Sequence, residues 1–451
     1  MPLDSWWGAE LLRGGADDAV WARAAGPVTN GSLRAEVARL AALFGGQGIG
    51  PGCTVAVQGT PSFTQLWSIF ALWSLGAQVL LLDPRLRGND RAALFAQCSP
   101  QVQLVLGGAL RTETFTEECE ILVRRLPGGA PARTGHCLVQ FSSGTTGRIK
   151  AIGRTPESLL GELNRLAAIP GMPGRGERVL LLDSVTHSFG LIGGVLHALN
   201  TGATLVFATG SLAAAARSAH VILGNPRHFE LLAAAPDALS LPGLRLAVSC
   251  GEILPQRGYD DFAERFGVLI GQAYGTTETG IVATDLGGRS GPRSIGLPAP
   301  GIRTAIIEGV LHVHVPQSPY LYEHHPWVGG WLSTQDLVAW NPEHRALRLR
   351  GRVDAERAGG TDVDLLEIET VLRAHRLVSN AVVLGDPVEA HVVGAAELDE
   401  AELRAWCRGL LRDGNLPSRY HLMRELPLTP NGKALRSRSG LRKHRLAVES
   451  R

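Results

Sequence analysis

The sequence has almost no lysine and almost no excess charge. Only three of its 44 basic residues are lysines, and those 44 nearly balance 42 acidic residues, which leaves a net charge of +2. So small an excess argues against broad binding to nucleic acid, which depends on neutralising many phosphates. A weak basic cluster at 436–445 reads better as a solvated segment than as a binding patch.

Long apolar runs are also missing. No stretch reaches the roughly 18–20 apolar residues that a bilayer-spanning helix needs. The nearest candidate, 66–82, contains Ser68, Ser74 and Gln78 and fits a buried helix followed by a strand. The first residues have neither the basic nor the apolar region of a signal peptide. We therefore expect a soluble, cytoplasmic protein with no membrane partner.

Closely spaced cysteines are absent as well. The six cysteines are scattered along the chain without a C-x-x-C spacing. This pattern disfavours a cysteine zinc site or a disulfide framework and fits reduced, buried thiols in a cytosol.

The apolar residues that are present follow a regular rhythm. With 451 residues, 45% of them hydrophobic and 19% charged, the chain is large enough for two or more folded domains. Short apolar strand candidates alternate with helix-like segments, which favours parallel α/β layers. The strand candidates are 54–58, 79–82, 102–106, 179–182, 204–207, 221–223, 246–249 and 268–270, and the helix candidates are 33–44, 63–75 and 161–168.

The pattern changes in the last third of the chain. After Gly291, short strand-like pieces rich in Gly, Pro and His continue to about Arg350. A unit of about a hundred residues follows, a normal size for a small domain. We expect a helix at 365–374, a strand at 381–384 and a helix at 399–411 in it. The sequence thus predicts an α/β fold with domains at 1–352 and 353–451.

Two of the three lysines lie in segments that suit phosphate chemistry. Lys150 ends a loop of hydroxyl side chains and glycines, which can wrap phosphate oxygens with backbone and side-chain donors. Lys433 follows the tight turn 429–432. In a chain that otherwise uses arginine, these positions favour a compact ammonium over a guanidinium fork. The first loop consists of Ser142, Ser143, Gly144, Thr145, Thr146, Gly147, Arg148, Ile149 and Lys150.

Two further segments carry polar groups beside strands. The run 273–280 combines the ring of Tyr274, threonine hydroxyls and the carboxylate of Glu278, an oxygen donor of the kind that Mg²⁺ prefers. Asp336, within 330–337, lies at a predicted strand end, where a lone acid usually caps a turn but could also accept hydrogen bonds from a ribose diol.

Together, the order and content of these motifs resemble the adenylate-forming superfamily, which includes acyl-CoA synthetases and peptide-synthetase adenylation domains. The resemblance runs from about Pro27 to Arg436, and 426–433 matches the family's C-terminal lysine motif almost letter for letter. It implies a large N-terminal adenylation domain of layered sheets and helices and a small, mobile α+β C-terminal domain. It also implies ATP and Mg²⁺, with CoA or a carrier protein's phosphopantetheine as acceptor.

The resemblance also implies roles for individual residues. Lys433 would bridge the carboxylate and the α-phosphate, Thr277 would bind that phosphate, and Glu278 would hold Mg²⁺. The loop 142–150 would bind the β- and γ-phosphates, and the small domain would turn about Asp354. The implied nucleotide contacts also include Gly251, Glu252, Tyr274, Gly275, Thr276, Asp336 and Arg352, and the implied acid pocket contains His187, Phe189, Gly190, Asn225 and Gly271.

The acid pocket segment 183–191 looks more like that of acyl- and aryl-acid ligases than that of amino-acid activators. Asp183 falls at a strand end, which is early for the aspartate that pairs an α-ammonium. His187 reads either as a packed, hydrogen-bonded histidine or as a substrate contact. Asn225 stands where the family usually has an apolar residue, so its amide could bond a polar group on the acid.

Departures from the family pattern leave the acceptor open. Ile149 and Ala151 flank Lys150 where the family has proline and glycine, and Gln335 replaces a glycine, which is tolerable if the backbone there is not left-handed. The loop 354–363 lacks the usual basic residue after its two glycines. The prediction is an ATP-dependent ligase that joins a small aryl or acyl acid to a thiol. The alternatives are an amide-forming ligase and a catalytically silent nucleotide-binding relative.

Overall fold

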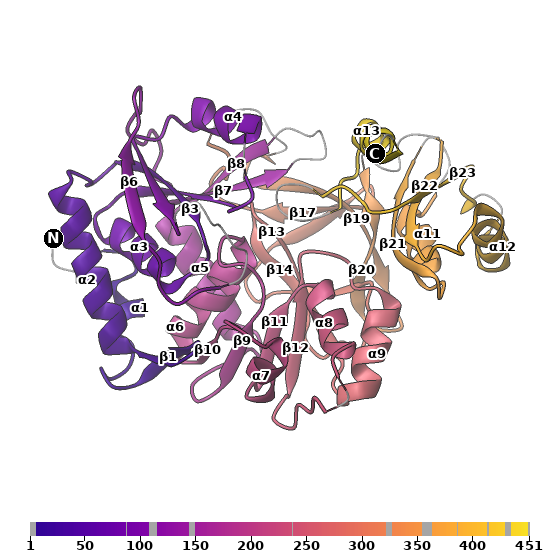
Figure 1. The fold of residues 1–451 in the computed structure, drawn as a ribbon, viewed down its shortest axis with the longest axis horizontal. Helices are drawn as coiled ribbons and strands as arrows, with labels where there is room; N and C mark the ends of the chain where they lie inside the picture. The colour runs from indigo at the N-terminus through magenta and orange to yellow at the C-terminus, as the bar shows by residue number, and fades with distance from the viewer. Residues whose placement is uncertain are drawn as a thin grey trace.

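The computed structural model describes residues 6–86, 88–107, 115–143, 149–236, 238–321, 327–353, 363–385, 387–412, 415–428 and 434–449. The chain runs along the long axis of the molecule, with a large N-terminal part and a small C-terminal domain at the far end (Figure 1). None of the helices in these residues is long and apolar enough to cross a bilayer. Of the cysteines, Cys53, Cys98 and Cys407 are buried, and the other three are partly exposed.

The larger sheet has a parallel half and an antiparallel half. Its parallel strands lie side by side in the order β1 (Val20–Arg23), β10 (Thr204–Val206), β9 (Arg178–Leu181), β11 (Val221–Gly224), β12 (Leu246–Cys250) and β13 (Ile270–Thr276), with β2 (Pro27–Thr29) antiparallel at the edge. The antiparallel half continues as β14 (Gly280–Asp285), β15 (Ser294–Pro298), β20 (Ala346–Arg352), β19 (Trp331–Asn341), β17 (Val310–His314) and β16 (Thr304–Ile307), and β18 (Trp327–Val328) pairs with β19. Antiparallel pairing begins with β14 at Gly280, so the change in strand pairing precedes the change of pattern predicted after Gly291.

A second sheet covers the first half of the N-terminal part. Its order is β6 (Ile121–Arg125), β5 (Val102–Leu106), β3 (Thr54–Gly59), β4 (Gln78–Leu82), β7 (Leu138–Ser143) and β8 (Ile149–Arg154). The strands β5, β3, β4 and β7 are parallel, and β7 and β8 form an antiparallel hairpin.

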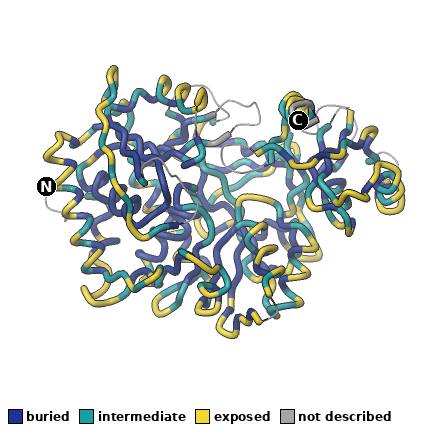
Figure 2. Tube along the Cα trace, in the orientation of Figure 1, coloured by how far each residue is buried: buried dark blue, intermediate teal, exposed yellow. Residues whose placement is uncertain are grey.

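Helices fill and flank these sheets. Every side chain of α3 (Phe63–Ser74) is buried, and one apolar cluster joins Val57 of β3, Phe70 of α3 and Leu181 of β9. The core of the N-terminal part is therefore shared by both sheets, as the buried segments in Figure 2 show. The other helices are α1 (Ala9–Arg13), α2 (Asn30–Gly46), α4 (Gly88–Cys98), α5 (Pro156–Ala168), the π-helix η1 (Phe189–Leu196), α6 (His197–Thr201), α7 (Leu212–Arg217), α8 (Pro226–Ala233) and α9 (Gln256–Phe266).

The C-terminal domain packs helices on a small sheet. Strands β21 (Val378–Leu384), β22 (Glu389–Gly394) and β23 (Arg419–Met423) lie side by side, and α11 (Leu365–Arg373), α12 (Glu400–Leu410) and α13 (Arg438–Glu449) accompany them. Its core includes Ile368, Val392 and Leu403, which are fully buried. An ion pair of 2.8 Å between Arg293 Nη2 and Asp364 Oδ2 joins this domain to the antiparallel half of the large sheet.

One predicted strand is wrong in its bounds. The sequence pattern places a strand at 268–270, whereas β13 begins at Ile270 and runs to Thr276. A side chain at Gly271 would lie 2.3 Å from the Leu286 carbonyl oxygen, and one at Gly275 would lie 2.3 Å from that of Gly280. The glycines that end the apolar run are therefore inside the strand, because β14 approaches too closely for a Cβ atom.

Candidate active site

The predicted ribose and adenine residues come together across three strands. The hydroxyl of Tyr274 on β13 donates to Asp336 Oδ2 on β19 at 2.6 Å, and Arg352 Nη1 on β20 lies 3.0 Å from Asp336 Oδ1. Burial and the neighbouring carboxylate raise the pKa of Tyr274 well above its usual value, so the phenol stays a donor.

Gln335 adopts a left-handed backbone beside this carboxylate. Its φ is 62°, which lies in the left-handed region. Glutamine in place of the family's glycine was expected to be tolerable only if the backbone here were not left-handed, and this condition is not met. The Ser333 and Thr334 hydroxyls accept from the backbone N–H groups of Gln335 and Asp336 at 3.3 and 3.1 Å. These two bonds hold the bend that turns Asp336 toward Tyr274 and Arg352.

The turn between β13 and β14 presents the predicted catalytic pair. The Thr276 and Thr279 hydroxyls lie 3.0 Å apart, and each accepts from the other residue's backbone N–H, at 3.2 and 3.3 Å. This mutual bonding closes a tight turn whose middle residues are Thr277 and Glu278, both half-buried. Gly251, with φ of 89°, and exposed Glu252 follow the neighbouring parallel strand β12.

The predicted phosphate loop connects the hairpin strands β7 and β8. Ser142 pairs with Lys150 and Ser143 with Ile149 in the hairpin register, and Lys150 is half-buried. Residues 144–148 lie outside the described residues, so the predicted contacts of Gly144, Thr145, Thr146 and Gly147 stay predictions, as do those of the Ser142 and Ser143 side chains.

A buried ion pair ties this hairpin to the turn after β13. Arg154, at the end of β8, places Nη2 2.7 Å from Glu162 Oε2 of α5, and both side chains are at most 5% exposed. The other oxygen of Glu162 accepts the backbone N–H of Ile281 at 2.9 Å. The Glu162 carboxylate also lies where a Cβ atom on residue 280 would be, so position 280 must be glycine. The φ of Gly280, 67°, is in the left-handed region, which also favours glycine. The sequence prediction missed this pair.

In the predicted acid pocket, His187 bridges two carboxylates from different sheets. Its Nε2 lies 3.4 Å from Asp83 Oδ2, directly after β4, and its Nδ1 lies 3.4 Å from Asp183 Oδ1, which follows β9. Although burial opposes protonation, these carboxylates raise the pKa of His187 to about 9. Burial likewise opposes ionisation of Asp83, yet bonds from His187 and Arg85 lower its pKa to about 2. At neutral pH the negative charges of Asp83 and Asp183 are therefore balanced by the positive charges of His187 and Arg85.

This bridge bears on the two interpretations of His187. Both ring nitrogens face carboxylates, so the geometry agrees with the packed, hydrogen-bonded histidine and leaves no ring N–H directed at a substrate. Sequence reasoning missed Asp83, although an acid immediately after a buried strand is a recognisable signal of a strand-end site.

The remaining predicted pocket residues have structural tasks. Phe189 and Gly190 begin the π-helix η1, a form often found at functional sites. A Cβ atom on Gly190 would lie 2.1 Å from the Ser184 carbonyl oxygen. Asn225 caps α8, because its Oδ1 accepts from the His228 N–H at 3.3 Å, and His228 Nδ1 accepts from the Asn225 N–H at 3.1 Å. The amide oxygen is thus used within the protein.

The predicted catalytic lysine and hinge, Lys433 and Asp354, lie outside the described residues. The residues on either side of Lys433 are paired with each other. Leu428 forms a β-bridge with Ala434, and the Leu435 N–H donates to the Pro427 carbonyl at 2.8 Å. Three residues after Lys433, Arg436 Nη2 donates to Glu369 Oε2 of α11 at 2.8 Å.

Arg436 also faces the N-terminal part. Burial opposes its charge, but Glu369 and then Glu252 raise its pKa, which places the Glu252 carboxylate, after β12, within electrostatic range of the segment that follows Lys433.

Comparison with known proteins defines the class first by fold. The crystal structure of the anthranilate CoA ligase AuaEII in complex with anthranoyl-AMP superposes with a TM-score of 0.83 and 20% identity, covering all of this chain and 99% of that one. The chain thus has the same overall fold as that ligase, which agrees with the predicted α/β architecture.

The family follows from the sequence. The family model described as AMP-binding enzyme matches residues 16–317, and that of the AMP-binding enzyme C-terminal domain matches 367–433. The chain belongs to the AMP-binding enzyme family, which confirms the family prediction. These limits leave the predicted domain boundary at 352 untested.

Its curated relatives include two aryl-acid ligases. The benzoate–CoA ligase of Thauera aromatica is 28% identical, over 68% of this chain and 66% of the relative. The p-hydroxybenzoic acid–AMP ligase FadD22 of Mycobacterium tuberculosis is 28% identical, over 95% of this chain and 68% of the relative. The chain therefore spans about two thirds of the length of these relatives.

Proposed function

We propose that this protein is an ATP-dependent carboxylic acid ligase. It activates a small aryl or acyl acid as acyl-AMP, releases pyrophosphate, and transfers the acyl group to a thiol. The observation that carries the proposal is the convergence of Tyr274, Asp336 and Arg352 next to the turn that bears Thr277 and Glu278, in a chain of this family.

The nucleotide would lie over the ends of β12 and β13. Tyr274 offers a ring face for the adenine, and Asp336 and Arg352 offer an acceptor and a donor for the ribose. The phosphates would then extend from Thr277 toward the hairpin that carries Lys150. The Arg154–Glu162 pair supports this path, because it holds the hairpin against the strand that follows Glu278.

The first step needs little covalent chemistry from the protein. The acid carboxylate attacks the α-phosphorus, the bond to the pyrophosphate oxygen breaks, and negative charge builds on the phosphoryl oxygens. The ammonium of Lys433 would stabilise this charge and orient the incoming carboxylate. The hydroxyl of Thr277 would donate to the same phosphate.

The turn residues suit a magnesium ion. Glu278 is half-buried, makes no ion pair within the described ranges, and stands beside threonine hydroxyls, which together form an oxygen-rich donor set. Glu278 would hold Mg²⁺, which when bound neutralises charge on the phosphate oxygens.

The charge balance in the acid pocket supports a simple acid over an amino acid. Asp183 faces His187, whose charge offsets that of the carboxylate and weakens its attraction for an α-ammonium group. Without His187 and Arg85, the two aspartates would repel a substrate carboxylate. The relatives that act on benzoate and p-hydroxybenzoic acid support an aryl acid as the first choice.

Carboxylate-dependent exchange of labelled pyrophosphate into ATP tests this proposal across a panel of aryl and alkyl acids. We expect exchange with at least one aryl acid, and weaker exchange with amino acids. No exchange with any acid, in folded protein that binds ATP, would exclude the ligase activity. Separate additions of CoA, phosphopantetheinylated carrier protein and amines to the active reaction then identify the acceptor.

A further inference from the structure

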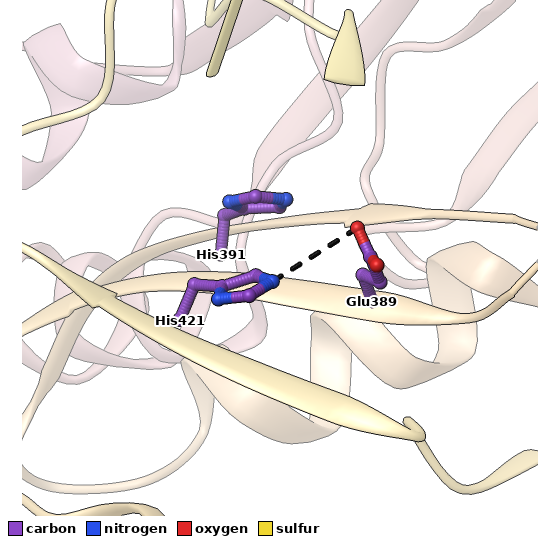
Figure 3. Close-up of side chains that lie close together, drawn as sticks. All are labelled: Glu389, His391 and His421. Carbon is purple, nitrogen blue, oxygen red and sulfur yellow. Dashed lines mark ion pairs between the residues drawn. The ribbon is translucent and has the colours of Figure 1, made fainter. Parts of the chain in front are cut away.

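One face of the small C-terminal sheet brings together metal-ligating side chains that the proposed function does not use. Strands β22 and β23 are parallel, with Glu389 opposite Arg419 and His391 opposite His421. Glu389 and His391 share a face because they are two residues apart on one strand. One ligand atom from each of Glu389, His391 and His421 lies within 4.8 Å of the others (Figure 3).

His391 is the least explained member of this cluster. It is 4% exposed, and within the part of the chain that the structure describes neither of its ring nitrogens has a hydrogen-bond partner. Its ring centroid lies 4.7 Å from that of His421. Buried polar groups are almost always hydrogen-bonded, so an imidazole without a partner indicates a missing one.

Burial disfavours the charged form of both imidazoles, and metals bind the neutral form. Burial, and then the positive charge of the neighbouring His421, lower the pKa of His391 to about 4. Burial and then Arg445 lower the pKa of His421 as well.

Arginines hold the cluster in its metal-free form. Arg438 Nε donates to Glu389 Oε2 at 3.1 Å, and Arg445 Nη1 lies 2.5 Å from His421 Nδ1. Because Arg445 can only donate, Nδ1 of neutral His421 carries the lone pair, and the ring proton is on Nε2, which faces Glu389 Oε2 at 3.9 Å. Arg419 Nη1 is 3.5 Å from Glu389 Oε1 but is largely exposed to solvent.

We propose that Glu389, His391 and His421 bind one divalent transition-metal ion, with Zn²⁺ as the fitting example, and that the ion replaces Arg438 and Arg445 at these side chains. Two imidazoles and one carboxylate form a three-ligand set that leaves a fourth position for water. Imidazole nitrogen distinguishes this site from the oxygen-rich turn at Glu278, which suits Mg²⁺.

Small movements are enough to form the site. Zinc–ligand distances of about 2.0–2.1 Å require the ligand atoms to close to roughly 3.3 Å from one another. The Arg438 side chain is 43% exposed, and its Nη2 also donates to the Gly385 and Pro387 carbonyls, so these bonds can hold the guanidinium while its Nε releases Glu389. The His421 proton shifts from Nε2 to Nδ1 once Arg445 leaves, so the ring loses no proton. Because both arginines belong to α13, metal binding is coupled to the contact between this helix and the sheet.

Calorimetric titration of the metal-stripped full-length chain with Zn²⁺ tests the site. We expect the wild type to bind one equivalent that His391→Ala and His421→Ala both lose, and that the exposed-residue control His344→Ala keeps. Removing a competing cation should tighten binding, so Arg438→Ala and Arg445→Ala should each lower the dissociation constant by about tenfold. Unchanged stoichiometry and affinity in both histidine variants would overturn the proposal, and so would no tightening in either arginine variant.

A second measurement does not depend on any variant. X-ray absorption of the wild-type protein with one equivalent of Zn²⁺ should show two imidazole ligands and oxygen neighbours. Sulfur neighbours, or a single imidazole, would place the ion elsewhere and overturn the assignment. Neither measurement uses adenylation activity, so the outcome is independent of the proposed ligase function.

Discussion

Each of the two lysine segments is followed by an arginine that pairs with a glutamate, and we call each of these ion pairs an anchor. Four residues after Lys150, Arg154 pairs with Glu162 of a helix, and the same carboxylate accepts the Ile281 N–H of a strand at 2.9 Å. In the C-terminal domain, three residues after Lys433, Arg436 pairs with Glu369 of a helix. That carboxylate accepts the Val383 N–H, also at 2.9 Å.

The anchors differ in how deeply the arginine lies. Arg154 is 3% exposed, whereas Arg436 is 39% exposed, although both glutamates are 5% exposed. The N-terminal anchor is therefore part of a sealed core shared by two sheets. The C-terminal anchor fixes the lysine segment within its own domain and leaves its arginine partly exposed to solvent. The burial of the arginine thus distinguishes the Arg154–Glu162 pair, which belongs to the core of the fold, from the Arg436–Glu369 pair, which holds one segment.

The largest effect is expected at the lysines themselves. Lys433→Ala should reduce pyrophosphate exchange by orders of magnitude and leave ATP binding and folding nearly unchanged, because it removes charge needed only in the transition state. Lys150→Arg should keep part of the activity, since a phosphate clamp tolerates a guanidinium better. Pyrophosphate-exchange rates and ATP affinities of both variants measure these effects. Normal adenylation by Lys433→Ala would refute the role of Lys433 in stabilising the transition state.

Breaking the deep anchor should cost the most stability. Glu162→Ala leaves Arg154 charged and buried and the Ile281 N–H without an acceptor, which should lower the free energy of unfolding by about 3–5 kcal/mol. Denaturant unfolding measures this loss. Glu157→Ala, an exposed glutamate of the same helix, should change stability by less than about 0.5 kcal/mol. Equal effects in the two variants would remove the distinction between buried and exposed positions.

Breaking the shallower anchor should cost less stability but still affect catalysis. Glu369→Ala should lower the free energy of unfolding by about 1–3 kcal/mol, because water can solvate the half-exposed Arg436. We expect kcat for adenylation to fall with little change in KM for ATP, since Arg436 positions the Lys433 segment. Glu397→Ala, on the exposed surface of the same domain, is the control. A normal kcat in folded Glu369→Ala would limit the pair to a structural role.

The His187 bridge is a third ionic contact, and its effect depends on pH. Because the folded pKa is raised to about 9 from an ordinary 6.5, its stabilisation is complete below about pH 6.5 and is lost as the pH rises through 9. We expect the stability difference between wild type and His187→Gln to shrink by about 2 kcal/mol over this interval, after allowance for partial exposure. A difference that does not vary with pH would mean that His187 is neutral.

The smallest effect is expected at Gln335, which touches neither anchor. Its left-handed backbone is unfavourable for a residue with a Cβ atom, so Gln335→Gly should raise the free energy of unfolding by about 0.5–1 kcal/mol. Thermal unfolding measures the gain. A loss of stability would show that the glutamine side chain makes a compensating contact.

Much of the fold could be predicted from the sequence because its signals are local. The helix predicted at 63–75 is α3, and the strands predicted at 54–58 and 102–106 are β3 and β5. Strands β22 and β23 were not predicted, because their apolar residues are interrupted by Glu389 and His391 in β22 and by Arg419 and His421 in β23. A pattern of hydrophobicity cannot show that such polar residues are buried.

The site was predictable in its motifs but not in its contacts. Tyr274, Asp336 and Arg352 were named from separate motifs, and the structure joins them. The amide of Asn225 suggested a substrate contact, whereas the structure uses it as a helix cap. The cap was missed because Pro226, at the first helical position, could signal either a turn or a helix start.

The sequence alone determined which residues are available for nucleotide chemistry and in what order they occur, because motif identity is a local property of the chain. Only the tertiary structure decided their partners. Tyr274 and Asp336 are 62 residues apart, Arg436 and Glu369 are 67 apart, and His187 and Asp83 are 104 apart. Such pairs form when strands and helices pack, and burial then sets their charge and strength.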